Sequence, residues 1–109
     1  MKITQVNHVN LIGVMSSEPR FHTLPNGSKV ARFSLSTQET FLDDEGNTKN
    51  VKSWHQITAW GSWVSLLEKM GESGKALAIE GKLRSRYYKT KAGEAKNITE
   101  VEVNDLVVL

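Results

Sequence analysis

One stretch of the chain has the periodicity of an α-helix, and its position constrains the fold more than any other feature. Its apolar residues recur at i, i+3, i+4 and i+7, which places them on one helix face: Trp63, Leu66, Leu67 and Met70. Ser62 can serve as the N-cap, and Gly71 and Gly74 end the pattern. We therefore predict one helix over residues 62–70, and we expect Trp63 to pack against the core.

Elsewhere, apolar and polar residues alternate with the period of two that is typical of β-strands. We predict strands over residues 4–15, 29–38, 51–60, 75–90 and 96–103, a short extended piece over 20–24, and a long polar loop over 39–50. Five strands with one helix between the third and the fourth is the order of the OB-fold, a small, partly open barrel that binds oligonucleotides or oligosaccharides. The sequence therefore predicts a mainly β, five-stranded OB-fold barrel, as one domain over residues 1–109.

Composition argues against several kinds of function. The chain has no cysteine, which excludes disulfides, thiolate metal sites and thiol catalysis. His8, His22 and His55 are too scattered for a metal site, and the sequence has neither a local pair of catalytic carboxylates nor a phosphate-binding glycine-rich loop. We therefore expect no metal, no cofactor and no enzymatic activity. Apolar runs are too short for a membrane span, and the N-terminus lacks a signal-peptide hydrophobic region, so we expect a cytoplasmic protein.

The predicted strand over residues 75–90 carries a local excess of positive charge. One of its faces combines three cations with a ring: Lys82, Arg84, Arg86 and Tyr88. Lys89 and Lys91 follow, and no acidic residue lies between Lys82 and Lys91, although 14 Lys and Arg nearly balance 12 Asp and Glu overall. We interpret Tyr87, on the opposite face, as a packing residue. Charges also protect solvated edge strands, but a face of cations with a ring favours single-stranded nucleic acid.

The predicted strand over residues 51–60 repeats this combination. Lys52, Trp54 and Trp60 share one face, while the opposite face supplies apolar residues for the core. Both tryptophans are therefore available to stack on bases, which contributes about 1–3 kcal/mol per base. Phe41, at the base of the 39–50 loop, is ambiguous, because its ring can pack over the barrel or face a base.

Several blocks of residues, taken together and in order, resemble the bacterial single-stranded DNA-binding protein (SSB) family over residues 7–103. Residues 7–13 and 30–37 match in order and spacing, and the most specific blocks are residues 53–55, 60–61 and 79–86. The resemblance implies an OB-fold homotetramer that wraps single-stranded DNA without sequence preference. It further implies a role in DNA replication, recombination and repair, at the nucleoid of the bacterial cytoplasm.

The same resemblance implies roles for individual residues. The family's stacking rings fall on Phe41, Trp54, Trp60 and Tyr88. Arg84 and Arg86 match its phosphate-contacting strand, and we assign the same role to the neighbouring cations, Lys52, Lys82, Lys89 and Lys91. His55 matches a position at the subunit interface, and the first strand, which carries His8 and Asn10, resembles the strand that pairs between subunits.

The chain departs from the family pattern in two respects. Gln56, Ser62 and Ser73 stand where basic residues are frequent, and each lost phosphate contact weakens binding and its salt dependence. We expect Arg32 and Lys75 to compensate. The acidic C-terminal tail with which family members recruit replication and repair enzymes is absent from the sequence, which ends at Leu109, so contacts with those enzymes are left open.

Two alternatives remain. A tailless primosomal replication protein of the PriB type would resemble the chain in length and would form dimers. A module that kept the barrel as a scaffold for protein interactions would form a stable oligomer with negligible DNA affinity. The missing basic residues and the acidic stretch over residues 43–45 favour this second alternative.

Overall fold

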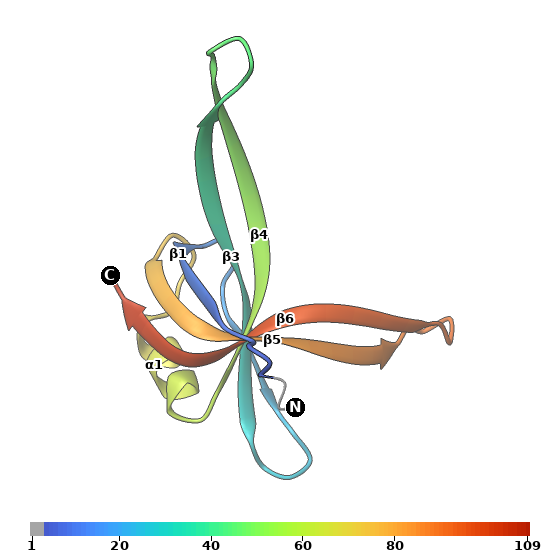
Figure 1. The fold of residues 1–109 in the computed structure, drawn as a ribbon. Coiled ribbons are helices and arrows are strands. Elements are labelled where there is room, and N and C mark those ends of the chain that lie inside the picture. Colours follow the sequence, from blue (N-terminus) through green and yellow to red (C-terminus); the bar gives the residue numbers. More distant parts are fainter. Residues whose placement is uncertain (1–3) are drawn as a thin grey trace.

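The computed structural model describes residues 4–109; residues 1–3, which the predicted domain includes, lie outside the described residues. Its elements are β1 (Val9–Met15), β2 (Arg20–Thr23), β3 (Lys29–Leu42), β4 (Thr48–Trp60), α1 (Ser62–Met70), β5 (Ala76–Lys89) and β6 (Ala95–Val108). The strands pair in the order β1-β5-β6-β4-β3-β2, and an additional β1–β3 pairing closes the barrel (Figure 1). The predicted OB-fold is confirmed. The short extended piece forms β2, so α1 lies between β4 and β5.

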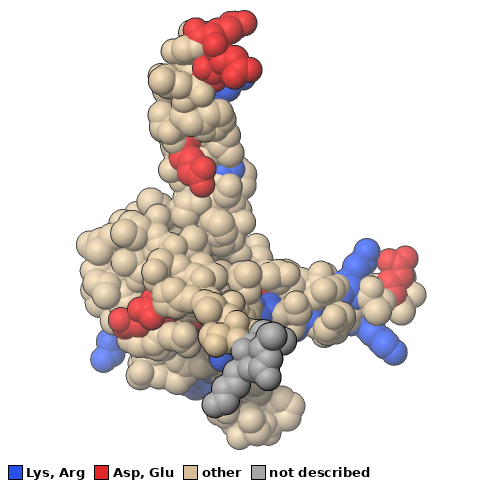
Figure 2. All heavy atoms as spheres, viewed as in Figure 1, with Lys and Arg blue, Asp and Glu red and all other residues tan. Residues whose placement is uncertain are grey.

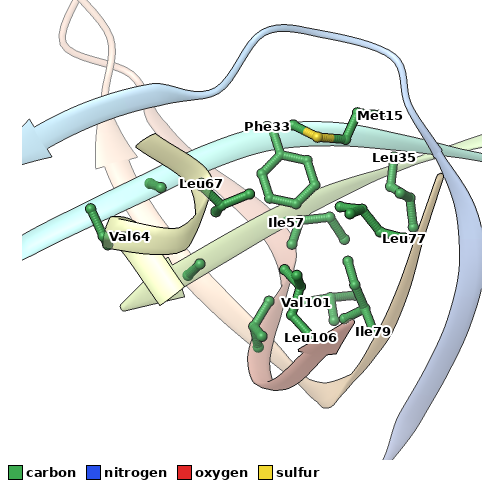
Figure 3. Close-up of a cluster of buried hydrophobic side chains, with 13 residues drawn as sticks. Met15, Phe33, Leu35, Ile57, Val64, Leu67, Leu77, Ile79, Val101 and Leu106 are labelled. Carbon is green, nitrogen blue, oxygen red and sulfur yellow. The ribbon is translucent and has the colours of Figure 1, made fainter. Parts of the chain in front are cut away.

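A single cluster of apolar side chains fills the barrel (Figure 3). Phe33 and Leu35 of β3 and Ile57 of β4 are at most 3% exposed, as strand alternation requires of core positions. Leu67 of α1 joins the cluster, and Trp63 packs against it as predicted. The core therefore fixes β4, the strand that carries the predicted tryptophan face, and its neighbour β3.

The ends of α1 depend on glycine. Ser62 is the first helical residue rather than the cap, so the N-cap prediction is wrong; the cap is Gly61, with φ of 61°, and no side chain caps the helix. Glycine suits this position because other residues are strained at positive φ. At the other end, the Gly71 N–H donates to the Leu67 carbonyl. With nine residues, α1 is too short to cross a membrane, and residues 4–109 contain no longer helix.

Two hairpins continue beyond the barrel, as the β3–β4 arm (residues 38–53) and the β5–β6 arm (residues 83–99) (Figure 1). They raise the radius of gyration to 16.5 Å, whereas a compact chain of this length has about 13 Å. The predicted 39–50 loop is therefore wrong in extent, because only residues 43–47 form the turn. The Asp43 carboxylate closes that turn by accepting the N–H groups of Glu45 and Asn47, at 3.0 and 2.8 Å.

β5 has a bulge between Glu80 and Gly81, where the strand passes from the barrel toward the β5–β6 arm. A Cβ at Gly81 would lie 2.1 Å from the Glu102 backbone oxygen, so this close approach requires glycine. Beyond the bulge the strand leaves the barrel, and Leu83 and Tyr87 are 49% and 76% exposed. The interpretation of Tyr87 as a packing residue is wrong, because no layer within residues 4–109 covers that face of the arm.

β1 carries apolar residues on both faces, and it begins at Val9 rather than at the predicted residue 4. Its inner face packs against the core cluster through Val9 and Leu11. Its outer face leaves Ile12 72% and Val14 41% exposed. Val107 of β6, a strand that extends past the predicted end at residue 103, is also exposed nearby and lines the same hollow as Ile12.

Candidate nucleic-acid interface

Three strands bring cations and a ring together in a groove beside the β5–β6 arm. One hollow, of about 280 Å³, is lined by Arg32 of β3, Trp60 of β4, and Arg84 and Arg86 of β5. A second hollow, of about 460 Å³, shares Arg32 and Arg86 with the first. The structure therefore brings together four of the predicted DNA-binding residues, three of them arginines.

The groove floor also contains a buried carboxylate, Glu100 of β6, which is 6% exposed. It accepts hydrogen bonds from Thr58 Oγ1 at 2.6 Å, Arg86 Nε at 2.8 Å and Arg32 Nε at 3.2 Å. Burial acts to raise its pKa, but the hydrogen bonds from Thr58 and Arg86 and the charges of both arginines outweigh burial and hold the pKa below 4.5. Glu100 is therefore a fixed negative charge that holds two guanidinium groups in place.

The third arginine has its own carboxylate partner. Arg84 Nη1 lies 2.6 Å from Glu102 Oε2, and these side chains are 63% and 19% exposed. Sequence reasoning placed Glu100 and Glu102 on the last strand without pairing them to the basic strand. Their alternation with the buried Val101 and Val103 could have indicated this pairing, because it places both glutamates on the same face of the sheet as the arginines of β5. The excess of positive charge is thus smaller than the sequence indicated.

Each of the two hairpins, β3–β4 and β5–β6, presents an exposed ring with a cation beside it. Trp54, on the β3–β4 strand pair, is 62% exposed, and Lys52 Nζ lies 5.7 Å from the centroid of its ring. Tyr88, on the β5–β6 arm, is 43% exposed, and Arg86 Cζ lies 5.5 Å from its ring centroid. These distances fall in the range of cation–π attraction. Both rings retain surface on which a base can stack.

Phe41 lies apart from the other rings. It is 46% exposed, so it does not pack fully over the barrel. The register pairs Phe41 with Lys49 and pairs Trp54 with Ser36, which puts Phe41 and Trp54 on opposite faces of the hairpin. The structure therefore does not gather the four predicted stacking rings onto one surface.

The remaining predicted cations are distributed along β5 and its ends. Lys82 is half-buried, and Lys89 and Lys91 are exposed at the outer end of the β5–β6 arm. Figure 2 shows basic side chains along this arm and acidic ones at the tips of both arms. Lys75 precedes the other end of β5, 3.7 Å from Glu72 Oε1. It is therefore far along the strand from the arginines of the groove.

The three predicted interface residues occupy two places. His8 Nδ1 lies 3.9 Å from Glu80 Oε1, and Asn10 lines a hollow of about 510 Å³ with Ile12. His55, on β4, is half-buried with its Nε2 2.9 Å from Thr37 Oγ1. Within residues 4–109, no three His, Cys, Asp or Glu side chains are grouped so as to hold a metal ion.

Comparisons with known proteins support the fold and place the chain in a family. The sequence profile of the "Single-strand binding protein family" matches residues 6–109. "Single-stranded DNA-binding protein 1" of Chlorobaculum tepidum is 33% identical over 105 residues, which cover 95% of this chain and 65% of that protein. The chain thus spans slightly less than two thirds of this relative.

Two solved structures are similar to the whole barrel. The Plasmodium falciparum SSB in complex with single-stranded DNA is 33% identical, with a TM-score of 0.86 over 100% of this chain and 99% of that one. The wild-type single-stranded DNA-binding protein of Thermus aquaticus is 26% identical, with a TM-score of 0.79 over 95% of this chain and 50% of that one. The chain belongs to the single-strand binding protein family.

Proposed function

We propose that this chain binds single-stranded DNA without sequence preference and without catalysing a reaction, and that it protects DNA exposed during replication, recombination and repair. One observation carries the proposal: Trp54 and Tyr88 are exposed on two different hairpins, each with a cation within 6 Å of its ring. Residues 1–109 form the binding domain in this proposal. Its place of action is the bacterial cytoplasm, at the nucleoid.

The chemistry of the surface supports a sequence-tolerant mode. Every base has a flat face that can stack on a ring, so Trp54, Tyr88 and the groove residue Trp60 do not select among bases. Arginine and lysine side chains contact the phosphates, which are the same at every nucleotide. Phe41 extends the stacking path around the β3–β4 arm, because its ring lies on the other face of that hairpin.

The phosphate-binding set combines the groove with the strands that leave it. It consists of Arg32, Lys52, Lys75, Lys82, Arg84, Arg86, Lys89 and Lys91. Arg32, Arg84 and Arg86 lie at the centre of this set, since they line one hollow with Trp60. Lys75 is the member least supported by its position as a phosphate contact, because it precedes the end of β5 that is remote from the arm.

We also propose a homotetramer whose contacts include the outer face of β1. Ile12, 72% exposed, and Val107, 51% exposed, form an apolar surface beside Asn10. His8 immediately precedes the same strand, and His55 contributes from β4. Burial of this apolar surface against a second copy would remove it from water, which is the usual driving force for assembly.

The test of DNA binding is a salt titration with poly-dT, followed by tryptophan fluorescence. We expect quenching as bases stack on Trp54 and Trp60, and an affinity that falls linearly with salt on logarithmic axes. Absence of both effects at low ionic strength would contradict the proposal. Native mass spectrometry with a dT oligomer then separates a tetramer from the dimer expected of a PriB-type protein.

One observation favours a second candidate, a protein-interaction scaffold. Glu100 and Glu102 already occupy all three groove arginines, which reduces the positive charge offered to phosphate. This candidate predicts a stable oligomer with negligible affinity for dT. The same titration decides between the two functions, because only the DNA-binding protein shows salt-dependent quenching.

A further inference from the structure

The two glutamates of the groove hold their arginines in different ways. Glu100 is 7% exposed in its side chain and receives three hydrogen bonds, so its contacts with Arg32 and Arg86 belong to the folded framework. Glu102 is 19% exposed and contacts Arg84, whose side chain is 63% exposed. An ion pair with so much solvent access contributes little to stability. Arg84 can therefore leave Glu102 at small cost, whereas Arg86 cannot readily leave Glu100.

The position of Glu102 makes it a competitor for phosphate. A carboxylate and a phosphate present similar pairs of oxygens to a guanidinium group, so one arginine fork can bind either of them. Glu102 and Arg84 both line the 280 Å³ hollow that also contains Trp60. A phosphate that approaches Arg84 in this hollow meets the negative charge of Glu102 at the same place.

We propose that Glu102 is an internal competitor that occupies Arg84 in the free protein and yields it to a DNA phosphate, and thereby sets the strength and the salt dependence of binding. This inference rests on the proposed binding of single-stranded DNA. It concerns a residue that does not itself hold the DNA. Competition by Glu102 therefore limits the affinity of the protein for DNA at the one phosphate that Arg84 binds.

The experiment compares Glu102→Gln with Glu68→Gln in binding to a labelled dT oligomer over a range of salt. Glu68 is a matched control, because it lies on α1, outside the groove, and is also paired, with its Oε1 3.9 Å from Lys29 Nζ. Both changes raise the net charge by one, but only Glu102→Gln frees an arginine in the groove. We expect Glu102→Gln alone to steepen the logarithmic salt slope by up to about 0.7, the value for one phosphate on a single strand, because a released Glu102 carboxylate no longer offsets the counterion that this phosphate gives up.

Arg84→Gln, made in the wild type and in the Glu102→Gln variant, tests whether the effect passes through Arg84. We expect Arg84→Gln to cost roughly threefold more affinity in the Glu102→Gln background at low salt, where Arg84 is available from the start. An equal cost in both backgrounds, or equal effects of Glu102→Gln and Glu68→Gln, would overturn the role of Glu102 while leaving DNA binding intact. Absence of binding by every variant at low salt would instead overturn the proposed function, and this inference with it.

Discussion

Replacing Trp54 by alanine separates a stacking residue from a packing residue. The ring is 62% exposed, so its loss removes little buried surface and should change the free energy of unfolding only slightly. Lys52 Nζ lies over the ring, 5.7 Å from its centroid, and so covers part of the surface on which a base could stack. We therefore expect one base to stack on Trp54, and its loss to cost about 1–3 kcal/mol of binding free energy, or roughly 5- to 150-fold in affinity.

The assay is the fluorescence anisotropy of a dye-labelled dT oligomer, titrated with protein at fixed salt. Trp63→Phe is a suitable control, because Trp63 packs against the core cluster and lies outside the groove. We expect Trp63→Phe to keep wild-type affinity. Thermal unfolding of both variants shows whether each remains folded under the binding conditions.

Two results would refute the reasoning about Trp54. A loss of affinity within the error of the titration would mean that no base stacks on this ring. A marked fall in melting temperature, with affinity reduced in proportion, would mean that the ring supports the fold of the β3–β4 hairpin. Either result would leave Tyr88 and Trp60 as the rings to examine.

Three further predictions address the β5–β6 arm, the groove and the assembly. Tyr88→Ala should weaken dT binding by about 1–3 kcal/mol, and Tyr87→Ala, on the opposite face of the arm, should weaken it less; equal losses in titrations would contradict this assignment of faces. Glu100→Gln should reduce the free energy of unfolding by about 1–3 kcal/mol near neutral pH. Because folding lowers the pKa of Glu100 from its ordinary value, its stabilising effect is complete above the pKa of the unfolded chain and is lost as pH falls through the lower pKa of the folded protein. Urea unfolding should therefore show wild type and variant converging toward acid pH, and a constant difference would contradict the pairing. Ile12→Asp should reduce the oligomer mass measured by sedimentation, whereas Leu42→Asp, at the exposed end of β3, should not; an unchanged mass for Ile12→Asp would exclude this face from the assembly.

The sequence predicted the barrel because buried strands and the one helix impose strict periods on apolar residues. Phe33 and Leu35 alternate as core positions, and the stripe from Trp63 to Met70 repeats at helical spacing. The β5–β6 arm falls within the predicted strands over residues 75–90 and 96–103, whereas the β3–β4 arm was predicted as a loop because it extends beyond the core. Residues 38–53 are solvated on both faces, so their backbone pairs as a ladder without any apolar alternation.

The candidate interface was also predicted in part, because local alternation reveals the face of a residue but not its partner on another strand. Trp54, Trp60 and the cations of β5 lie on the expected faces of their strands, because alternation determines these faces locally. The partnership of Arg84 with Glu102, 18 positions along the chain, depends instead on the register between β5 and β6, which sets Arg84 opposite Glu100 and diagonal to Glu102. Composition and local charge do not reveal such a register, so the strand that looked most basic is partly neutralised.

Photo-crosslinking of a dT oligomer that contains 5-iodo-deoxyuridine, followed by mass spectrometry of the peptides, tests the central claim most directly. The iodinated base reacts with aromatic rings on which it stacks, so it reports where bases lie on the folded protein. We predict crosslinks at Trp54, Trp60 and Tyr88, lost when the salt concentration is raised enough to dissociate the complex. Crosslinks confined to other residues, or none at low salt under conditions in which the oligomer is bound, would contradict the account.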